Sequence, residues 1–227
     1  MRDKRVSGVA RVNQVMFITM TPDNAIPDLS GLAPRTRERI EEALLNVFST
    51  REFHKVGMAE IAREARVSLQ TLYKYYGSKE ALLYSGLDHW MAQVTERMLD
   101  HLQGIQTYKD RLRKVFWVLL DFYDRNPKVG LLMQNAIYFN AWSREPALRQ
   151  PQFTHVFIQV LTEGRAAGVL TDEVDERDLL DVFYGVAARV ISQWLSRGMR
   201  EPLAARADAL FELIWRAIAK PGAAAPE

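Results

Sequence analysis

The hydrophobic positions of the chain follow a helical period almost throughout, beginning just after Pro34. In the first such stretch Ile40, Leu44 and Val47 recur every three or four residues, which places them on one face of a helix. Because no segment alternates apolar and polar residues with the period of a half-buried strand, the sequence predicts an all-α fold. Further helices are expected over residues 58–65, 68–76, 78–102, 110–123, 127–137, 152–167, 175–197 and 203–220.

Several of these helices have recognisable ends. Pro34 suits a first helical turn, since its fixed φ is already helical and its missing N–H is not needed there. Ser68 is expected to cap the helix over 68–76, and Asn126 followed by Pro127 is typical of a cap and a first-turn proline. Gly168 favours the end of the helix over 152–167.

The pattern divides the chain into three parts. Residues 1–33 show neither helical nor strand period and are expected to form a flexible N-terminal tail. Residues 34–80 contain three short helices, and residues 81–227 contain a larger set of helices. Met16 and Met20 lie inside the predicted tail, so the sequence leaves open whether translation starts at Met1 or at an internal methionine such as Met20.

Composition indicates an ordinary globular protein. Among 227 residues, 48% are hydrophobic and 26% are charged, which excludes wholesale disorder. The chain has no cysteine, so disulfides, thiolate nucleophiles and zinc sites built on sulfur are excluded, and a cytoplasmic location is expected. The longest uncharged run, residues 129–143, is shorter than the roughly 20 apolar residues that span a bilayer, so no membrane segment is expected.

The distribution of charge is more informative than the net charge of +2. Residues 34–82 hold nine basic and seven acidic side chains, whereas residues 83–227 hold 17 basic and 18 acidic ones. Between Val67 and Lys79 there is no acidic residue at all. A basic surplus confined to one segment is a weak indication of contact with phosphate groups.

Residues 61–76 predict a helix-turn-helix. Two short helices are joined by about three residues, and small side chains such as Ala62 and Ala65 allow the helices to approach closely. A small internal core is expected from Ile61, Ala62, Ala65, Val67 and Leu72.

The remaining polar residues of the second helix are expected on its exposed face. A glutamine such as Gln70 pairs with adenine, a lysine such as Lys74 reaches guanine, and the methyl group of Thr71 suits thymine. Tyrosine hydroxyls, here Tyr73 and Tyr75, suit phosphate oxygens. The alternative is an ordinary helical hairpin whose polar residues are merely solvated.

Residues 65–82, ARVSLQTLYKYYGSKEAL, resemble the recognition-helix signature of the TetR (tetracycline-repressor-like) family of bacterial transcription regulators. Ile61-Ala62 lies at the spacing found in the family, and Gly168-Val169-Leu170 is similar to the family's entry into its penultimate helix. The resemblance implies an N-terminal three-helix DNA-binding domain over 34–80 and a larger C-terminal helical domain over 81–227 for ligand binding and dimerisation. Its partners would be a double-stranded DNA operator, a small-molecule effector and a second copy of the chain.

The resemblance also implies roles for individual residues. Thr71, Tyr73 and Lys79 occupy positions that contact backbone phosphates, Leu69, Gln70 and Lys74 occupy positions that face base edges, and Tyr75 occupies one that does either. The predicted DNA-binding residues are Ser68, Leu69, Gln70, Thr71, Tyr73, Lys74, Tyr75 and Lys79.

The sequence departs from the family pattern at two positions. Gly57 stands where a capping serine or threonine is common, and glycine caps a helix less well. Arg66 stands in place of the usual turn glycine, which carries a modest conformational cost if that residue is left-handed.

A regulator of this kind places two recognition helices about 34–36 Å apart, so a homodimer is expected. The last two predicted helices carry apolar stripes that suit a four-helix bundle between two copies, although both stripes would equally suit the core of a single copy. The predicted interface residues are Phe183, Val186, Val190, Trp194, Leu210 and Ile214.

Between these two regions lies a block rich in aromatic residues. Such residues at helical spacing usually form core, but their number and the family resemblance together predict a cavity for an elongated apolar effector such as a fatty acyl chain or an aromatic compound. The predicted lining residues are Trp90, Trp117, Met133, Tyr138, Phe139, Trp142 and Phe157.

The alternative class is a helical ligand-binding protein or an enzyme that does not read DNA sequence. Tyr75 and Lys79 have a reductase-like spacing, but no glycine-rich turn accompanies them to hold a dinucleotide. No Gly-x-Ser-x-Gly, phosphate-binding loop or His-Glu-x-x-His occurs, and the four histidines are scattered. The sequence therefore predicts no catalytic residues, no metal site and no cofactor. It favours a transcriptional regulator, which we expect to act as a repressor.

Overall fold

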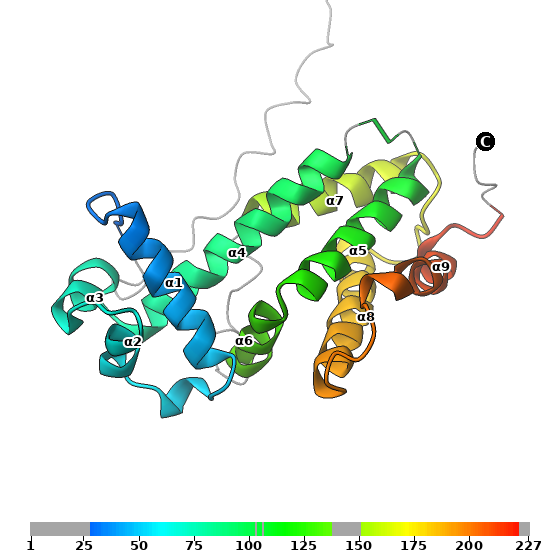
Figure 1. Ribbon diagram of the computed structural model, residues 1–227. Coiled ribbons are helices and arrows are strands. Elements are labelled where there is room, and N and C mark those ends of the chain that lie inside the picture. The colour runs from blue at the N-terminus through cyan, green and yellow to red at the C-terminus, as the bar shows by residue number, and fades with distance from the viewer. Residues whose placement is uncertain (1–27, 103, 106, 138–150, 223–227) are drawn as a thin grey trace, which may run out of the picture.

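The computed structural model describes residues 28–102, 104–105, 107–137 and 151–222. These residues form an all-helical structure, as the hydrophobic pattern predicts, and their β-structure is confined to one isolated antiparallel bridge between Leu170 and Ala219 (Figure 1). The α-helices are α1 (Pro34–Phe48), α2 (Met58–Glu64), α3 (Leu69–Tyr76), α4 (Lys79–Leu102), α5 (Tyr108–Arg125), α6 (Pro127–Ile137), α7 (Pro151–Ala166), α8 (Glu176–Ser196) and α9 (Ala207–Ile218), with short 3₁₀ turns η2 (Phe53–Lys55) and η3 (Ala204–Arg206).

Helices α1, α2 and α3 form a small unit at one end of the molecule, and we call residues 28–78 the N-terminal head (Figure 1). Ile40, Leu44, Ile61 and Leu72 are fully buried and join the three helices. Ala62 and Ala65 are also buried, which confirms that small residues lie where the helices approach most closely. The core predicted for this unit is therefore present, with Val67 half-buried at its edge.

The head begins earlier than the sequence indicated. Residues 28–33, assigned above to the tail, form a turn in which the backbone N–H of Leu32 donates to the carbonyl of Leu29 at 2.9 Å. Leu32 is only 9% exposed and packs against the core, so its hydrophobic contact holds the turn in place. Residues 1–27 of the predicted tail lie outside the described residues.

Helix α4 is the longest of the described helices and links the head to the rest of the molecule, which we call the C-terminal domain (residues 79–222) (Figure 1). Gly86 allows α4 to approach α1, since a Cβ there would clash with Leu44 and lie 3.1 Å from the ring of Trp90. Helix α4 also runs along α5, so one rigid element contacts both the head and the centre of the C-terminal domain.

Helix α5 is the central helix of the C-terminal domain. It packs against α4, α6, α7, α8 and α9, and Phe116, Val118 and Leu120 have no exposed area. The ring of Phe116 lies 5.4 Å from that of Phe183 on α8 and 6.4 Å from that of Phe211 on α9, measured between centroids. The nearly continuous apolar sequence of this helix thus reflects burial on most sides.

Most predicted helix ends are confirmed. Pro34 opens α1, and Ser68 caps α3 by accepting a hydrogen bond from the backbone N–H of Thr71 at 3.0 Å. Gly168 adopts φ 70° at the end of α7. Asn126 differs from its prediction, because its side-chain amide donates to the carbonyl of Phe122 at 2.9 Å and so ends α5. An asparagine between two consecutive helices can bind the free groups of either one, and here it binds the preceding helix.

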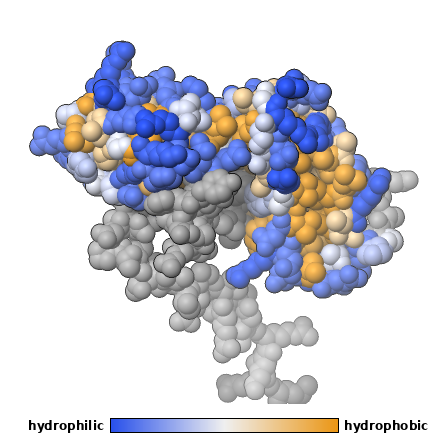
Figure 2. Space-filling view, turned by 90° about the horizontal axis from the view of Figure 1, so that it is seen from below, coloured by the Kyte–Doolittle hydropathy of each residue, from blue (hydrophilic) through white to orange (hydrophobic). Residues whose placement is uncertain are grey.

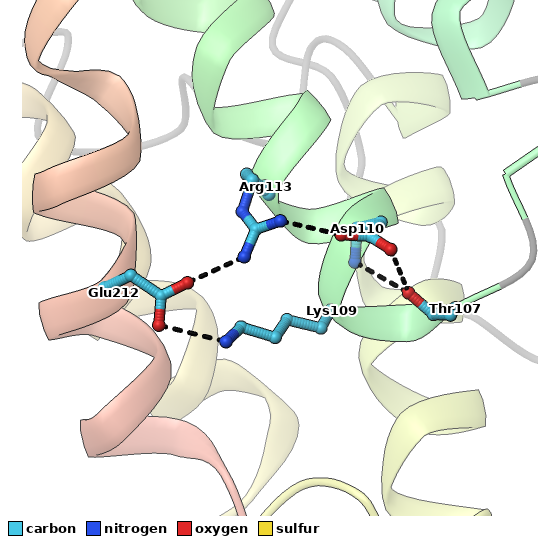
Figure 3. Close-up of polar contacts among 5 residues, drawn as sticks. All are labelled: Thr107, Lys109, Asp110, Arg113 and Glu212. Carbon is cyan, nitrogen blue, oxygen red and sulfur yellow. Dashed lines mark hydrogen bonds and ion pairs between the residues drawn. The ribbon is translucent and has the colours of Figure 1, made fainter. Parts of the chain in front are cut away.

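Charged side chains connect the helices of the C-terminal domain. Asp121 on α5 accepts hydrogen bonds from Arg97 on α4 at 2.6 Å and from Arg125 at 3.0 Å. Glu212 on α9 binds Lys109 at 2.9 Å and Arg113 at 2.7 Å, both on α5 (Figure 3). Arg113 also contacts Asp110 at 2.8 Å. These contacts fix the relative positions of α4, α5 and α9.

Among the described helices, none has both the length and the apolar character needed to cross a bilayer.

Candidate nucleic-acid interface

Helix α3 presents one face to the core and the other to solvent. Leu72 and Tyr76 are buried, whereas Leu69, Gln70, Tyr73 and Lys74 are exposed, with 52% of Tyr73 and 39% of Leu69 accessible. A large apolar side chain and an aromatic one left in solvent on an eight-residue helix favour a surface that meets a partner. The predicted exposure is therefore confirmed for Gln70, Tyr73 and Lys74, whereas Thr71 and Tyr75 are half-buried.

The N-terminus of α3 is held by paired hydroxyl groups. Besides accepting from the backbone of Thr71, the hydroxyl of Ser68 lies 2.7 Å from that of Thr71. Either hydroxyl can donate in this pair, and the remaining lone pairs and hydrogen stay available to an outside group. The pair therefore stabilises the start of the helix and leaves polar atoms beside its exposed face.

The turn that precedes α3 contains a left-handed residue. Arg66 has φ 53°, as its replacement of a turn glycine implies, and its carbonyl accepts a hydrogen bond from Arg39 on α1 at 3.2 Å. The contact from α1 helps to hold the strained turn, and the sequence analysis did not identify Arg39 because the pair is separated by 27 residues. The side chains of Arg63 and Arg66 are exposed and make no ion pair with another described residue.

Gly57 occupies the N-cap of α2, the position that the family pattern assigns to a serine or threonine. Its φ of −101° and ψ of 155° are extended values that any residue adopts, and α2 has no side-chain cap. Glu60 lies in the first turn of α2, where its negative charge suits the helix dipole, and it pairs with Arg51.

Lys79 makes several contacts inside the protein, in addition to its predicted role in contacting phosphate. Its ammonium group donates to the carbonyl oxygens of Phe53 at 2.9 Å and Val56 at 2.8 Å, and it lies 4.2 Å from the centroid of the Phe53 ring. Since an ammonium group has three N–H bonds, one remains for another acceptor. Lys79 therefore joins the start of α4 to the segment that precedes α2, a tertiary role that the motif alone did not reveal.

Tyr75 is likewise engaged inside the protein. Its hydroxyl donates to the carbonyl of Gly31 at 2.7 Å, and the ammonium group of Lys74 lies 4.9 Å from the centroid of its ring. The predicted contacting residues thus fall into two groups. The side chains of Gln70, Tyr73 and Lys74 lack hydrogen bonds and ion pairs to other described residues, whereas the side chains of Ser68, Thr71, Tyr75 and Lys79 already make internal hydrogen bonds.

The aromatic residues predicted to line one cavity lie in separate places. Trp90 is 5% exposed and packs beside Gly86 near α1, and Phe157 is 3% exposed and packs 4.7 Å from the ring of Phe183. Trp117 borders an open surface groove with Lys114 and Arg113, and Met133 on α6 is half-buried against the core. Tyr138, Phe139 and Trp142 lie outside the described residues.

Phe157 borders a cavity between α4, α5 and α7. The volume of this cavity, about 10 Å³, is enough for a single water molecule. Its lining is almost wholly apolar, and it consists of Thr95, Met98, Leu102, Leu112, Val115, Phe157 and Val160.

The residues predicted for the dimer interface fall into two groups, one buried and one partly exposed. Phe183 and Ile214 have at most 2% exposed area, and the indole N–H of Trp194 donates to the carbonyl of Glu201 at 2.7 Å, so these three belong to the core of a single copy. A residue without exposed area cannot contact a second copy unless the protein rearranges. Val186, Val190 and Leu210 keep part of their surface.

Two large apolar residues of α8 and α9 are exposed although the sequence analysis did not select them. Val182 is 41% exposed and Leu213 is 61% exposed, and a Cβ added at Gly185 would meet no atom within 4 Å beyond the adjacent residues and backbone of its own helix. Figure 2 shows a broad apolar surface on the half of the molecule that contains these helices, whereas the head is largely hydrophilic. The outward stripe of α8 is thus shifted by about one residue from the predicted one.

Comparison with known proteins agrees with this architecture. The family model for bacterial regulatory proteins of the tetR family matches residues 40–84, and that for the YsiA-like protein C-terminal region matches residues 87–217. The fatty acid metabolism regulator protein of Bacillus subtilis is 21% identical over 178 residues, which cover 78% of this chain and 92% of that protein.

Two further relatives extend the comparison. A helix-turn-helix transcriptional repressor of Streptomyces coelicolor is 28% identical over 154 residues, covering 67% of this chain and 76% of that protein. The crystal structure of FadR from Bacillus subtilis in complex with stearoyl-CoA superposes with a TM-score of 0.68 at 22% identity, covering 78% of this chain and 96% of that one. These relatives are transcriptional regulators, not enzymes, and the chain belongs to the TetR family of bacterial transcriptional regulators.

Proposed function

We propose that this protein is a ligand-responsive repressor that binds a palindromic operator as a homodimer and releases it when an elongated apolar effector binds. The observation that carries the proposal is the exposed face of α3, where the side chains of Gln70, Tyr73 and Lys74 make no hydrogen bond or ion pair to the rest of the described chain. Polar side chains on the exposed face of a capped helix, free of internal hydrogen bonds and ion pairs, are suited to read base edges and phosphates.

In this proposal the residues of α3 divide between specificity and positioning. Gln70 pairs with an adenine, and Leu69 meets the methyl group of a thymine. Lys74 reaches a guanine or a phosphate, and the hydroxyls of Tyr73 and Thr71 contact phosphates. The remaining N–H of Lys79 is available to a phosphate on the same side of the head.

The homodimer is proposed to form through the exposed surfaces of α8 and α9. Val182 and Leu213 are large apolar residues in contact with solvent, and Gly185 leaves room for a close approach of a second α8. Two such helix pairs bury these residues in a four-helix bundle. Val186, Val190 and Leu210 border the same surface, whereas Phe183, Trp194 and Ile214 support it from inside.

The effector is proposed to enter between α4, α5 and α7. The lining of the small cavity there is apolar apart from Thr95, which favours a ligand with a hydrocarbon portion. The Bacillus subtilis FadR, a relative with the same fold, was crystallised with stearoyl-CoA, which supports a fatty acyl effector as the first candidate. A cavity of this size must expand to admit an acyl chain, so ligand binding and helix movement are linked.

That linkage supplies the regulatory mechanism. An effector that binds better when α4 and α5 are apart changes the direction of α4, which carries the head at its N-terminal end. The operator then binds the effector-bound protein less tightly, and by reciprocity the effector binds the DNA-bound protein less tightly by the same factor. A typical coupling changes both affinities about 5- to 150-fold.

Selection of bound DNA from a random pool by the full-length protein tests the proposal. We expect enrichment of an inverted repeat whose half-sites lie about one helical turn apart. An acyl-CoA added to the selected complex should release the DNA, and a short-chain acyl-CoA of equal charge serves as the control. Recovery of unenriched DNA would contradict the regulatory function, and release by both acyl-CoAs alike would contradict an apolar effector.

A further inference from the structure

The turn ahead of α1 is attached to the recognition helix by one specific hydrogen bond. Tyr75 on α3 donates its hydroxyl to the carbonyl of Gly31 at 2.7 Å, across 44 positions of sequence. A Cβ added at Gly31 would lie 3.4 Å from this hydroxyl and 3.7 Å from the ring, so the side chain of Tyr75 lies directly beside Gly31.

The turn itself is well defined. The N–H of Leu32 donates to the carbonyl of Leu29, the N–H of Ser30 donates to the carboxylate of Asp28 at 3.0 Å, and Leu32 is buried. The hydrogen bond to Asp28 lowers the pKa of that carboxyl. The acceptor of the Tyr75 bond is therefore held in place by its own neighbours and does not depend on a mobile side chain.

Tyr75 differs in this respect from the tyrosine two positions before it. Tyr73 is 52% exposed, and its hydroxyl makes no hydrogen bond to another described residue. Tyr75 is half-buried, and its hydroxyl has already donated its only hydrogen to Gly31. The two side chains belong to the same short helix, yet only Tyr73 has a free donor to offer a phosphate oxygen.

The position of Tyr75 on α3 matters for the orientation of the helix. The buried residues Leu72 and Tyr76 are four positions apart, so they lie on one line along α3. Contacts along a single line only weakly prevent the helix from rotating about that line. Tyr75 lies about 100° around the axis from Tyr76, so its attachment to Gly31 restrains that rotation. Recognition groups must be held within about 10–20° of their productive geometry to function.

We propose that Tyr75 is a positioning residue that sets the orientation of α3 through the carbonyl of Gly31. Residues 28–33 thereby contribute to DNA recognition by the N-terminal head. This inference rests on the proposed DNA-binding function. The turn ahead of α1 therefore affects the recognition of DNA sequence indirectly, because Tyr75 positions α3 and does not itself contact DNA.

Hydrogen exchange of the DNA-free protein, combined with DNA affinity, tests the inference. Tyr75→Phe removes only the hydroxyl and should accelerate exchange of the backbone N–H groups in residues 30–33 and at the end of α3. It should also weaken binding to the selected operator about 3- to 10-fold, the effect expected for one net hydrogen bond. Tyr73→Phe is the matched control, and it should leave the exchange of residues 30–33 in the free protein unchanged.

A second variant separates positioning from direct contact. Leu32→Ala loosens the same turn, so Tyr75→Phe should cause little further loss of affinity in that background. If Tyr75 contacts DNA directly, the two losses add, and Tyr75→Phe leaves the exchange of residues 30–33 unchanged; either result overturns the inference. Faster exchange with undiminished operator affinity also overturns it. A wild-type protein that selects no DNA sequence would instead overturn the proposed function, whatever the exchange result.

Discussion

In the head, the side chains of Gln70, Tyr73 and Lys74 extend into solvent without hydrogen bonds or ion pairs to the described chain, whereas in the C-terminal domain Asp121 and Glu212 each bind two cationic side chains. The first arrangement leaves hydrogen-bonding groups available to another molecule. The second uses them to join α5 to α4 through Asp121 and to α9 through Glu212, the latter shown in Figure 3. The contrast indicates that the side chains of Gln70, Tyr73 and Lys74 contribute little polar stabilisation to the fold, so these positions can vary with the operator while the C-terminal contacts must be kept.

Within the head, substitution of a buried residue of α3 should have the largest effect. Leu72→Ala removes a fully buried side chain between α2 and α3 and should lower the free energy of unfolding by about 2–5 kcal/mol. Denaturant unfolding measures this change. Leu69→Ala, at an exposed position of the same helix, is the control and should change stability by no more than about 0.5 kcal/mol. Equal losses would mean that the two faces of α3 are not distinct.

Substitutions of the two ion-paired carboxylates, Asp121 and Glu212, should lower stability by different amounts. The side chain of Asp121 is 9% exposed, and Asp121→Asn should lower the free energy of unfolding by about 1–3 kcal/mol because Arg97 loses its charged partner. Glu212 is 37% exposed, and Glu212→Gln should cost less than about 1 kcal/mol. Thermal or denaturant unfolding of the two variants under the same conditions makes the comparison. A larger loss for Glu212→Gln would contradict the assignment of Asp121 as the principal link.

Acid should weaken the ion pairs that Asp121 makes with Arg97 and Arg125. Burial by itself raises the pKa of Asp121, but the hydrogen bonds and charges of Arg97 and Arg125 outweigh it and lower that pKa below 3.8. A lowered pKa in the folded state contributes stability above the unfolded value, and this stability is lost as pH falls through the folded value. Unfolding measured from pH 5 downward should therefore show a smaller decline for Asp121→Asn than for the wild type.

Alkaline pH should lower the stability of the N-terminal head. Burial, and to a lesser extent the charge of Glu41, raises the pKa of Tyr76 from 10.0 to about 12. A raised pKa contributes stability that is complete below pH 10 and is lost as pH rises through about 12. Tyr76→Phe should flatten the decline in stability over this interval, and Tyr73→Phe should not. Parallel declines in wild type and Tyr76→Phe would show that Tyr76 ionises as readily in the folded protein as in the unfolded chain.

The smallest effect is expected at the turn before α3. Arg66→Gly relieves the strain of a left-handed arginine but makes the unfolded chain more flexible, so a net gain of at most about 1 kcal/mol is expected. The same change removes an exposed positive charge, and it should weaken binding to cognate and scrambled DNA by similar factors. Loss of stability would indicate that the arginine side chain, and not only its backbone, supports the turn.

Much of the head could be predicted because its signals are local. Pro34 at the start of α1 and Ser68 at the cap of α3 each depend on a few neighbouring residues, and the left-handed turn at Arg66 follows from its place in the motif. The contacts of Tyr75 with Gly31 and of Lys79 with Phe53 and Val56 were not predicted, because they join segments 23 or more positions apart. No sequence period reports such a contact.

The C-terminal domain was predicted only at the level of helices. A helix with an apolar stripe shows the same period whether that stripe faces its own core or a second copy, and Phe183, Trp194 and Ile214 illustrate the ambiguity. The exposed positions Val182 and Leu213 became evident only once the neighbours of α8 and α9 were placed. The separate locations of Trp90, Trp117 and Phe157 could not be inferred, because an aromatic residue in a sequence does not indicate which helices will surround it.

Affinity measurements with Gln70→Ala test the central claim most directly. Binding of the wild type and this variant is compared on the selected operator, on single-base changes at each half-site position, and on scrambled DNA over a range of salt concentrations. The account predicts a loss of roughly 1–3 kcal/mol on the operator, reduced discrimination at one base pair per half-site, and little change on scrambled DNA. Equal losses on operator and scrambled DNA, or unchanged discrimination at every position, would contradict a role of α3 in reading sequence.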